Sequence, residues 1–402
     1  MAAQRIVVVG ASMGGLRAAE QLRAAGWTGR ITLFGAEAHP PYNRPPLSKE
    51  ALAGTVDFPS LALRRRSSVS DVEWRLGTTV TAARLHDRTL ELGTGEQVAF
   101  DGLVAATGVR PRRLPLPGPA AGRHTVRTID DADGLRAALL RPGVRVAVVG
   151  AGFIGCEVAA TAIGLGAAEV TVIDPEPLPM LRPLGRPLAE VLLERHRERG
   201  VRFALGRTVT AFQGTDRVTG IVLDDGTELP ADVVVEAVGS LPNTEWLAGN
   251  GLDLSDGVRT DELLRAGSLP HAVAVGDVAR FPNARYDGVP RRVEHWSIPG
   301  DSAKHAAAAL TAHLMGAEPD RAPFAPLPAF WSDQHGFRIQ SFGAPSLGMD
   351  DIRVLEGSAD KDITVGYHTH DRLVGVVALG GPKAMAGAAR HRAGLLAQPA
   401  AA

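Results

Sequence analysis

The chain of 402 residues contains a single cysteine, Cys156. One thiol cannot form an intramolecular disulfide, and it cannot supply a dithiol redox pair or a structural zinc cage. Cys156 stands near the start of an Ala-rich segment, so we expect a small helix residue packed against a sheet. The sequence therefore predicts no bound metal and no redox-active cysteine.

Long apolar runs and a large net charge of either sign are also missing. No apolar run approaches the roughly 20 residues that a membrane-spanning helix needs, and the first strand begins too early to leave room for a signal peptide. The 43 basic and 44 acidic side chains give a formal net charge of −1, which offers no overall attraction to nucleic acid. We expect a cytoplasmic protein of two or three domains that binds neither membranes nor nucleic acid.

Two basic clusters interrupt this balance, Arg64–Arg66 and Arg291–Arg292. Such clusters are most often solvated faces of a protein. The alternative is a docking patch for an acidic partner, and the sequence leaves both interpretations open.

What is present is a glycine-rich turn that occurs twice. Residues 6–15 read Ile-Val-Val-Val-Gly-Ala-Ser-Met-Gly-Gly, and residues 146–155 read Val-Ala-Val-Val-Gly-Ala-Gly-Phe-Ile-Gly. In each, an apolar strand runs into a glycine-rich loop and then into an Ala-rich helix, which is the dinucleotide-binding βαβ layout. Two bound dinucleotides in one chain predict electron transfer between them.

The first turn is followed by the residues that such a site requires. Gly10 permits the tight turn, Gly15 permits close packing of helix on strand, and the helix N-terminus offers N–H groups to a pyrophosphate. Ser12 replaces the usual middle glycine. Glu37 follows the second strand, where a carboxylate binds the ribose.

The second turn carries all three glycines of the motif and has Asp174 at the end of its second strand. A carboxylate at this place accepts hydrogen bonds from the adenosine ribose and repels a 2′-phosphate, and no basic residue lies between Asp174 and Arg182. This predicts NAD rather than NADP, with a strand-end cap as the alternative role of Asp174. Glu157, on the first helical turn, is either an ordinary helix acid or a carboxylate that faces the nicotinamide.

The other segments alternate between strands, loops and helices. Residues 39–49 contain four prolines and are expected to be neither helix nor central strand. We expect short strands over 72–105 and fraying of the Ala-rich tail from 384. The remaining predictions are a strand at 273–278, a helix at 300–315, a linker at 323–328, and strands at 337–343, 363–367 and 373–379.

Segments spread over nearly the whole chain resemble a known family. Pro41-Tyr-Asn-Arg-Pro-Pro-Leu-Ser-Lys49 and Phe330-Trp-Ser-Asp-Gln334 are similar to segments of the FAD-dependent, NADH-dependent ferredoxin reductases that serve ring dioxygenases and haem-thiolate monooxygenases. Ala106–Pro111, Ala274–Asp277 and Val293–Trp296 extend the resemblance.

The resemblance implies an α/β fold with two Rossmann-like dinucleotide-binding domains and a small α+β C-terminal domain. Its implied boundaries are 1–111 with 240–317 for FAD, 112–239 for NAD, and 318–402 for the C-terminal domain. It also implies hydride transfer from NADH to FAD and single-electron transfer to an iron–sulfur ferredoxin, a 2Fe–2S protein by preference. The protein would be a monomer or a homodimer.

The resemblance further implies roles for individual residues. Lys49 would lie near the reacting edge of the flavin, paired with Glu157, and Trp296 would lie beside the ring; these three are the expected catalytic residues. The residues expected to contact FAD are Gly10, Ser12, Gly14, Gly15, Glu37, Arg44, Lys49, Val80, Thr107, Gly108, Arg127, Gly276, Asp277 and Trp296. Those expected to contact NADH are Gly150, Gly152, Phe153, Ile154, Gly155, Glu157, Asp174, Arg182, Gly239 and Glu294.

Three positions, Ser12, Ala36 and Ile298, depart from the family pattern, which leaves FAD affinity and a polar contact at the flavin edge open. Other functions also remain open. A rubredoxin reductase would have a similar sequence. An NADH oxidase would need an active cysteine near the flavin, and Cys156 lies in the other domain. A redox-sensing interaction protein resembling the apoptosis-inducing factors would carry targeting segments and a C-terminal insertion, which this sequence does not show.

Overall fold

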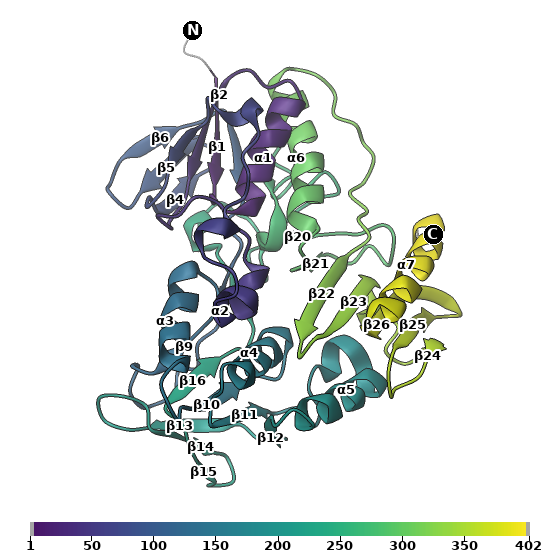
Figure 1. Ribbon diagram of the computed structural model, residues 1–402. Coiled ribbons are helices and arrows are strands. Elements are labelled where there is room, and N and C mark those ends of the chain that lie inside the picture. Colours follow the sequence, from purple (N-terminus) through teal and green to yellow (C-terminus); the bar gives the residue numbers. More distant parts are fainter. Residues whose placement is uncertain (1–3, 399–402) are drawn as a thin grey trace.

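The computed structural model describes residues 4–398, which contain three five-stranded sheets. Two of the sheets are parallel and the third is antiparallel. Figure 1 shows the first parallel sheet at one end of the molecule, with the second parallel sheet and the antiparallel sheet at the other end. This is the predicted α/β class with two Rossmann-like sheets.

The first sheet has the strand order β19-β7-β1-β2-β3. Its strands are β1 (Arg5–Val9), β2 (Arg30–Phe34), β3 (Glu73–Arg75), β7 (Gly102–Ala105) and β19 (Ala272–Ala274). Helices α1 (Met13–Ala24) and α6 (Ile298–Leu314) pack against each other beside it (Figure 1). Residues 6–9 of β1 are all buried, as expected for a central parallel strand that is covered on both faces.

The second sheet has the strand order β12-β11-β10-β16-β9. Its strands are β9 (Arg123–His124), β10 (Arg145–Val149), β11 (Glu169–Asp174), β12 (Arg202–Leu205) and β16 (Val233–Glu236). The helices of this part are α3 (Ile129–Leu139), α4 (Phe153–Gly164) and α5 (Leu181–Arg197). The turn from β10 into α4 repeats the turn from β1 into α1, as the paired glycine motifs predict.

Smaller elements accompany the two parallel sheets. Each sheet has a three-stranded antiparallel companion, and the chain crosses between the two halves through a two-stranded ribbon, β8 with β17. These strands are β4 (Val80–Arg84), β5 (Thr89–Leu92), β6 (Gln97–Ala99), β8 (Val109–Pro111), β13 (Val209–Gln213), β14 (Gly220–Leu223), β15 (Glu228–Pro230) and β17 (Ser240–Pro242). The remaining short elements are α2 (Glu50–Ala53), β18 (Val258–Arg259), β20 (Ala279–Phe281) and β21 (Arg291–Arg292).

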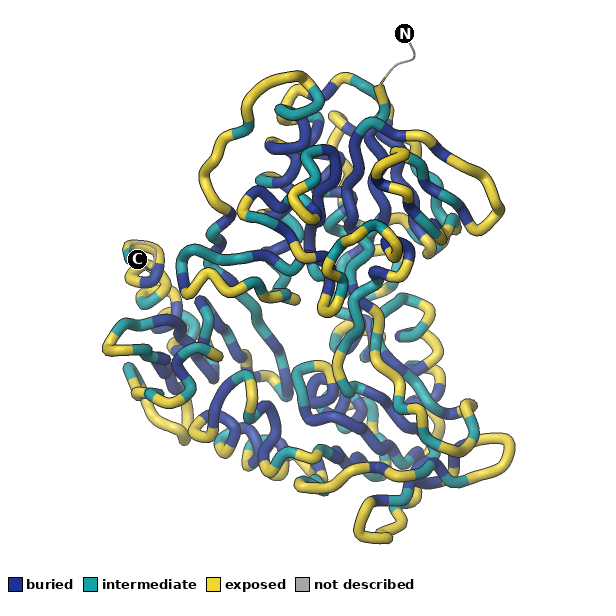
Figure 2. Tube along the Cα trace, turned by 180° about the vertical axis from the view of Figure 1, so that it is seen from behind, coloured by how far each residue is buried: buried dark blue, intermediate teal, exposed yellow. Residues whose placement is uncertain are grey.

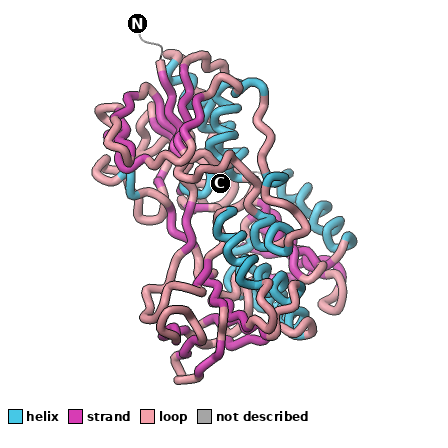
Figure 3. The backbone as a smooth tube through the Cα atoms, turned by 60° about the vertical axis from the view of Figure 1, so that its left-hand side comes forward, coloured by secondary structure: helices cyan, strands magenta, loops and turns pink. Residues whose placement is uncertain are grey.

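The third sheet has the order β22-β23-β26-β25-β24 and packs against α7, which lies beside it in Figure 1. Figure 3 shows helices beside strands in both halves of the molecule. Its strands are β22 (Ala329–Gln334), β23 (Phe337–Gly343), β24 (Ile352–Gly357), β25 (Ile363–Thr369) and β26 (Arg372–Gly380). The expected fraying is wrong for residues 384–397, because α7 spans Pro382–Ala397; residues 399–402 lie outside the described part of the chain. Ala384 and Ala388 of this helix are buried against the sheet. Because the exposed face of the helix also contains alanine, the sequence shows little difference in hydropathy between the two faces.

Two local expectations also need correction. The strand predicted at 273–278 ends at Ala274, because Gly276 adopts φ +71° and begins a 3₁₀ turn. The Pro-rich loop 39–49 contains a 3₁₀ turn at Pro45–Ser48, which proline at the first position of a helical turn permits. The predicted helix at 300–315 is α6, which begins two residues earlier at Ile298.

The interior of each part is apolar, and Figure 2 shows buried residues concentrated in the strands with exposed residues on the loops. Cys156 is fully buried, as expected, but it belongs to a core cluster with Leu184 of α5 and Tyr367 of the third sheet. Burial raises the pKa of its thiol well above the ordinary value, so the thiol stays protonated and unreactive. Within residues 4–398, no helix is both long and apolar enough to cross a membrane.

Candidate functional site

A cavity of about 1240 Å³ lies between the first sheet, the start of α4 and the third sheet. Its lining comes from the first glycine turn, the Pro-rich loop, the start of α4, the segment 289–299 and β22. Typical small-molecule sites measure about 300–1,000 Å³. This cavity is therefore large enough for a dinucleotide and the reacting part of a second ligand.

The first glycine turn brings its backbone against the cavity. Gly10 has φ +113°, and a Cβ placed on it would lie 2.1 Å from the carbonyl oxygen of Ala106. A Cβ on Gly15 would lie 1.9 Å from the carbonyl oxygen of Gly10. The turn therefore requires glycine at both positions, and Ser12 and Gly14 line the cavity beside the N-terminus of α1, which suits a pyrophosphate.

The predicted ribose carboxylate, Glu37, lies at one end of the cavity and is held by two donors. Arg44 places a guanidinium nitrogen 2.6 Å from Glu37 Oε1, and the Tyr42 hydroxyl donates to Glu37 Oε2 at 2.5 Å. Arg44 also donates to Ser12 Oγ at 3.3 Å. Arg44 thus connects the Pro-rich loop to the glycine turn and fixes the loop over the cavity.

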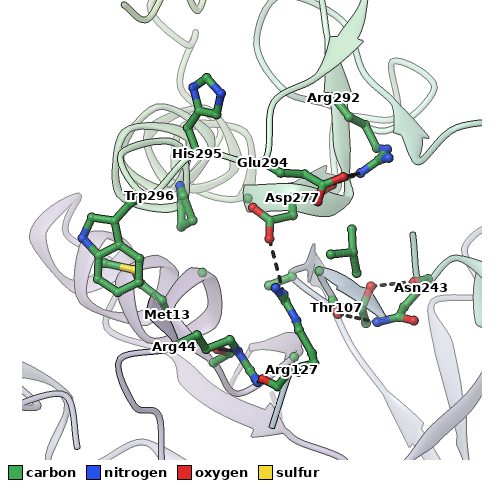
Figure 4. Close-up of a pocket in the computed structure, with 18 of the residues that line it drawn as sticks. Met13, Arg44, Thr107, Arg127, Asn243, Asp277, Arg292, Glu294, His295 and Trp296 are labelled. Carbon is green, nitrogen blue, oxygen red and sulfur yellow. Dashed lines mark hydrogen bonds and ion pairs between the residues drawn. The ribbon is translucent and has the colours of Figure 1, made fainter. Parts of the chain in front are cut away.

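Two further pairs form the wall in Figure 4. Arg127 points toward Asp277, with 3.4 Å between guanidinium and carboxylate. Burial raises the pKa of Asp277 above its ordinary value, while Arg127 opposes this shift. Asn243 donates to the Thr107 carbonyl oxygen at 2.9 Å, and the Thr107 hydroxyl donates to the Asn243 carbonyl oxygen at 2.7 Å. The Thr107–Asn243 contacts join the start of β8 to the end of β17, the two segments in which the chain crosses between its halves.

Glu157 is the carboxylate on which three parts of the chain converge. Its side chain is buried, and Lys49 Nζ lies 2.9 Å from Oε2. Ser48 donates to the same oxygen at 2.5 Å, and Ser332 donates to Oε1 at 2.6 Å. A buried carboxylate persists as an ion only with such partners, so this arrangement holds a cation and an anion at the cavity.

Aromatic side chains form the opposite wall. Trp296 and Trp331 meet edge to face with ring centroids 6.2 Å apart, and Phe153 meets Phe330 at 4.7 Å. Trp296 lines the cavity and follows Glu294 and His295, which Figure 4 labels beside it. Burial lowers the pKa of the neighbouring His295 to about 4, so this imidazole is neutral at pH 7. The four aromatic rings therefore give the cavity a water-excluding surface beside the Lys49–Glu157 pair.

The second glycine turn repeats the geometry of the first. Gly150 has φ +105°, and a Cβ on Gly155 would lie 1.9 Å from the Gly150 carbonyl oxygen. A Cβ on Gly152, by contrast, would meet no atom of residues 4–398 within 4 Å. The position of Gly152 is therefore open for a ligand, while the start of α4 reaches the cavity through Phe153 and Ile154.

Asp174 caps the second glycine turn with one carboxylate oxygen, and its other oxygen binds the loop that follows its own strand. Oδ2 accepts the Ala151 N–H at 2.6 Å, and Oδ1 accepts the Glu176 N–H at 2.8 Å. Glu176 forms an ion pair with the exposed Arg182 at 2.5 Å. The structure thus provides the strand-end cap that the sequence offered as the alternative, and the ribose role of Asp174 stays a prediction.

Asp174→Ala tests that role. We expect the ratio of kcat/KM for NADH to kcat/KM for NADPH to fall about tenfold, because the variant loses a carboxylate that accepts from the ribose and repels a 2′-phosphate. We also expect lower affinity for both nucleotides, since the turn loses its cap. Steady-state kcat/KM values for NADH and NADPH measure both effects, and an unchanged ratio would leave Asp174 as a cap alone.

The cavity brings together most of the predicted site residues, while the rest surround the two glycine turns. The predicted residues that line it are Gly10, Ser12, Gly14, Glu37, Arg44, Lys49, Val80, Thr107, Gly108, Arg127, Phe153, Ile154, Glu157, Gly276, Asp277, Glu294 and Trp296. Those outside its lining are Gly15, Gly150, Gly152, Gly155, Asp174, Arg182 and Gly239.

Sequence reasoning missed several residues of the site. Tyr42, Ser48 and Ser332 each donate a hydrogen bond to a predicted site carboxylate. All three lie inside the two segments on which the family resemblance rests. Their residue types were therefore visible in the sequence, but the carboxylate that each one binds was not. Ile298 is buried in the core of the first sheet, so this position makes no polar contact to a ligand.

Comparisons with known proteins agree with this geometry. Residues 4–303 match the family model described as pyridine nucleotide-disulphide oxidoreductase, and residues 329–398 match the model described as reductase C-terminal. The chain is 40% identical to the probable ferredoxin reductase CtmF of Castellaniella defragrans over 375 residues, 92% of this chain and 88% of that protein.

Two further matches concern putidaredoxin reductase. The chain is 37% identical to putidaredoxin reductase CamA of Pseudomonas putida over 381 residues, 92% of this chain and 87% of that protein. The crystal structure of the covalent putidaredoxin reductase–putidaredoxin complex matches with a TM-score of 0.89 at 33% identity, covering 98% of this chain and 93% of that one. Family models, relatives and fold agree: the chain belongs to the pyridine nucleotide-disulphide oxidoreductase family.

Proposed function

We propose that this protein is a ferredoxin reductase that takes hydride from NADH onto FAD and passes single electrons to an iron–sulfur ferredoxin. The Lys49–Glu157 pair carries the proposal, because it joins the loop over the first glycine turn to the first turn of α4 after the second. It therefore lies where ligands of the two turns would meet. The names of the relatives, ferredoxin reductases among them, support the same assignment.

The residues around the cavity suit FAD at the first turn. Gly10, Ser12 and Gly14 leave room at the N-terminus of α1 for its pyrophosphate, and Glu37 offers a ribose acceptor. FAD supplies a ring that accepts two electrons as hydride and returns them one at a time. Lys49 would provide positive charge beside that ring, which favours an arriving hydride. Trp296 and the aromatic wall would exclude water from the reacting atoms.

The proposal includes a division of the chain into domains. Residues 1–111 and 240–317 would form the FAD domain, 112–239 the NAD domain, and 318–402 the C-terminal domain. The crossing at β8 and β17 supports this division, because it lies between the two glycine-turn sheets. The proposal also includes a 2Fe–2S partner, a monomeric or homodimeric protein, and the cytoplasm, where NADH is available.

The position of Cys156 supports an external electron acceptor. Its thiol lies in the core between α5 and the third sheet, and it is absent from the cavity lining of the described chain. An internal thiol acceptor would have to reach the flavin. Electrons would therefore leave to a partner protein.

Anaerobic reduction tests the proposal. The purified protein, reconstituted with FAD if necessary, should be yellow and should bleach on addition of NADH. Iron–sulfur proteins from the same genome are then added to the reduced protein, and reoxidation is followed by absorbance. A protein that cannot bind FAD would overturn the proposal. Bleaching without transfer to any of these carriers, together with an NADH-dependent change of oligomeric state, would favour a sensing function instead.

Ionic strength should reveal how the partner docks. Arg291 and Arg292 are neutralised by Asp287, Asp256 and Glu294 at 2.6–2.7 Å. In the Arg64–Arg66 cluster, only Arg66 has a carboxylate of the described chain within 4.0 Å, that of Glu20 at 3.6 Å. We therefore expect the latter cluster to attract an acidic ferredoxin.

The expected result is that kcat/KM for ferredoxin falls about tenfold between roughly 0.01 and 0.2 M ionic strength. Arg64→Glu with Arg65→Glu should remove most of this dependence. Arg217→Glu, in the exposed turn between β13 and β14, is a charge reversal away from this cluster and serves as the control for Arg64→Glu alone. A flat salt response in the unaltered protein would leave both clusters as solvated faces.

A further inference from the structure

The third sheet contributes a side chain to the Lys49–Glu157 pair. Ser332 lies on β22, is fully buried, and donates to Glu157 Oε1 at 2.6 Å. The other oxygen, Oε2, accepts from Ser48 and Lys49. Each of the two carboxylate oxygens is thus held from a different side, so the plane of the carboxylate is fixed by both.

The direction of the Ser332 hydroxyl is itself determined. Gln334 donates its side-chain N–H to Ser332 Oγ at 2.9 Å, so the hydroxyl hydrogen is free to point at Glu157. The Gln334 side-chain oxygen then faces His196 Nε2 at 2.8 Å. His196 must carry its proton on Nε2, because an amide oxygen only accepts.

The chain of donors continues to the edge of the third sheet. With Nε2 protonated, neutral His196 accepts at Nδ1, and His335 Nε2 lies 3.2 Å from that atom. Burial lowers the pKa of both imidazoles, that of His335 to about 4, so both are neutral at pH 7. Every hydrogen bond from His335 to Ser332 therefore points the same way, and the series ends on the carboxylate. Aligned hydrogen bonds polarise one another and strengthen the last one.

We propose that Ser332, oriented by Gln334 and His196, is a positioning residue that holds the Glu157 carboxylate against Lys49. The inference rests on the proposed function, because the pair it orients is the one assigned to hydride transfer. It assigns the third sheet a share in the reacting centre, in addition to its packing on α5. The hydroxyl acts through Glu157.

Ser332→Ala is the first test, with Ser341→Ala as the matched control. Ser341 is equally buried on the neighbouring strand β23, but its hydroxyl oxygen has no hydrogen-bond partner within residues 4–398. In stopped-flow reduction by NADH, Ser332→Ala should lower the limiting rate constant about tenfold, because small displacements of reacting groups carry large rate penalties. The Kd for NADH should change less than about twofold, Ser341→Ala should match the unaltered protein, and Ser332→Thr should restore most of the rate.

A second measurement uses the apoprotein and needs no turnover. If Ser332 and Glu157 interact, the losses of Tm in Ser332→Ala and Glu157→Gln should be strongly non-additive in the double variant. Additive losses, or equal reduction rates in Ser332→Ala and the unaltered protein, would overturn the inference. If Ser332→Ala does not fold, Gln334→Ala removes the amide that orients the hydroxyl, and an unchanged rate there would overturn it too. An unaltered holoprotein that NADH does not bleach would instead overturn the proposed function, while the apoprotein cycle still tests the contact.

Discussion

Gly155→Ala should give a yellow protein that dithionite bleaches and NADH does not. The added Cβ would lie 1.9 Å from the Gly150 carbonyl oxygen, a backbone atom that cannot move without opening the turn. Forcing an extra carbon into such a contact typically costs about 1–3 kcal/mol and shifts the backbone. The N–H groups of α4 would then no longer converge on a pyrophosphate. FAD should stay bound, because the first glycine turn is untouched.

Gly152→Ala is the control for this prediction. Its Cβ would meet no atom of residues 4–398 within 4 Å, so the fold should be unaffected, and thermal melting checks this. The motif places this glycine where the backbone approaches the pyrophosphate, so we expect a raised Kd for NADH without loss of Tm. If Gly155→Ala were reduced by NADH at the normal rate, the second turn would not be the NADH site.

Lys49→Met should slow flavin reduction by NADH about 100-fold, the usual loss when one charge-stabilising group is removed from a reacting centre. The same substitution should destabilise the fold. Glu157 is buried and would keep only the hydroxyls of Ser48 and Ser332 as donors. Breaking a buried ion pair by removing one partner typically costs about 3–5 kcal/mol, and these hydroxyls place the expected loss at the lower end.

The double variant Lys49→Met with Glu157→Gln separates the two effects. The double variant has no unpaired carboxylate at position 157, so its Tm should return most of the way to that of the unaltered protein. The reduction rate should stay low, because the positive charge of Lys49 is still missing. Rapid-mixing absorbance and thermal melting together measure both quantities. A single Lys49→Met variant with normal reduction kinetics would contradict the catalytic assignment of Lys49.

Much of the fold was predictable because its signals are local. Each glycine turn is a short stretch whose backbone geometry only glycine allows, so Gly10 and Gly150 identified two Rossmann-like units before any contact was known. Helix α7 was not predictable in this way. Its buried alanines differ little in hydropathy from their exposed neighbours, and only packing against β26 distinguishes the two faces.

The residues of the candidate site also fall into those that local sequence signals identify and those that packing brings together. The two dinucleotide turns, the acidic residues that follow them and the absence of a second thiol can all be read from the amino-acid sequence. The folded chain was needed to show that Asp174 caps the glycine turn before it and that Glu157 receives donors from Ser48, Lys49 and Ser332. The reason is physical: a turn is specified by neighbouring residues, whereas a buried carboxylate takes its partners from whichever segments the packing brings within hydrogen-bonding distance.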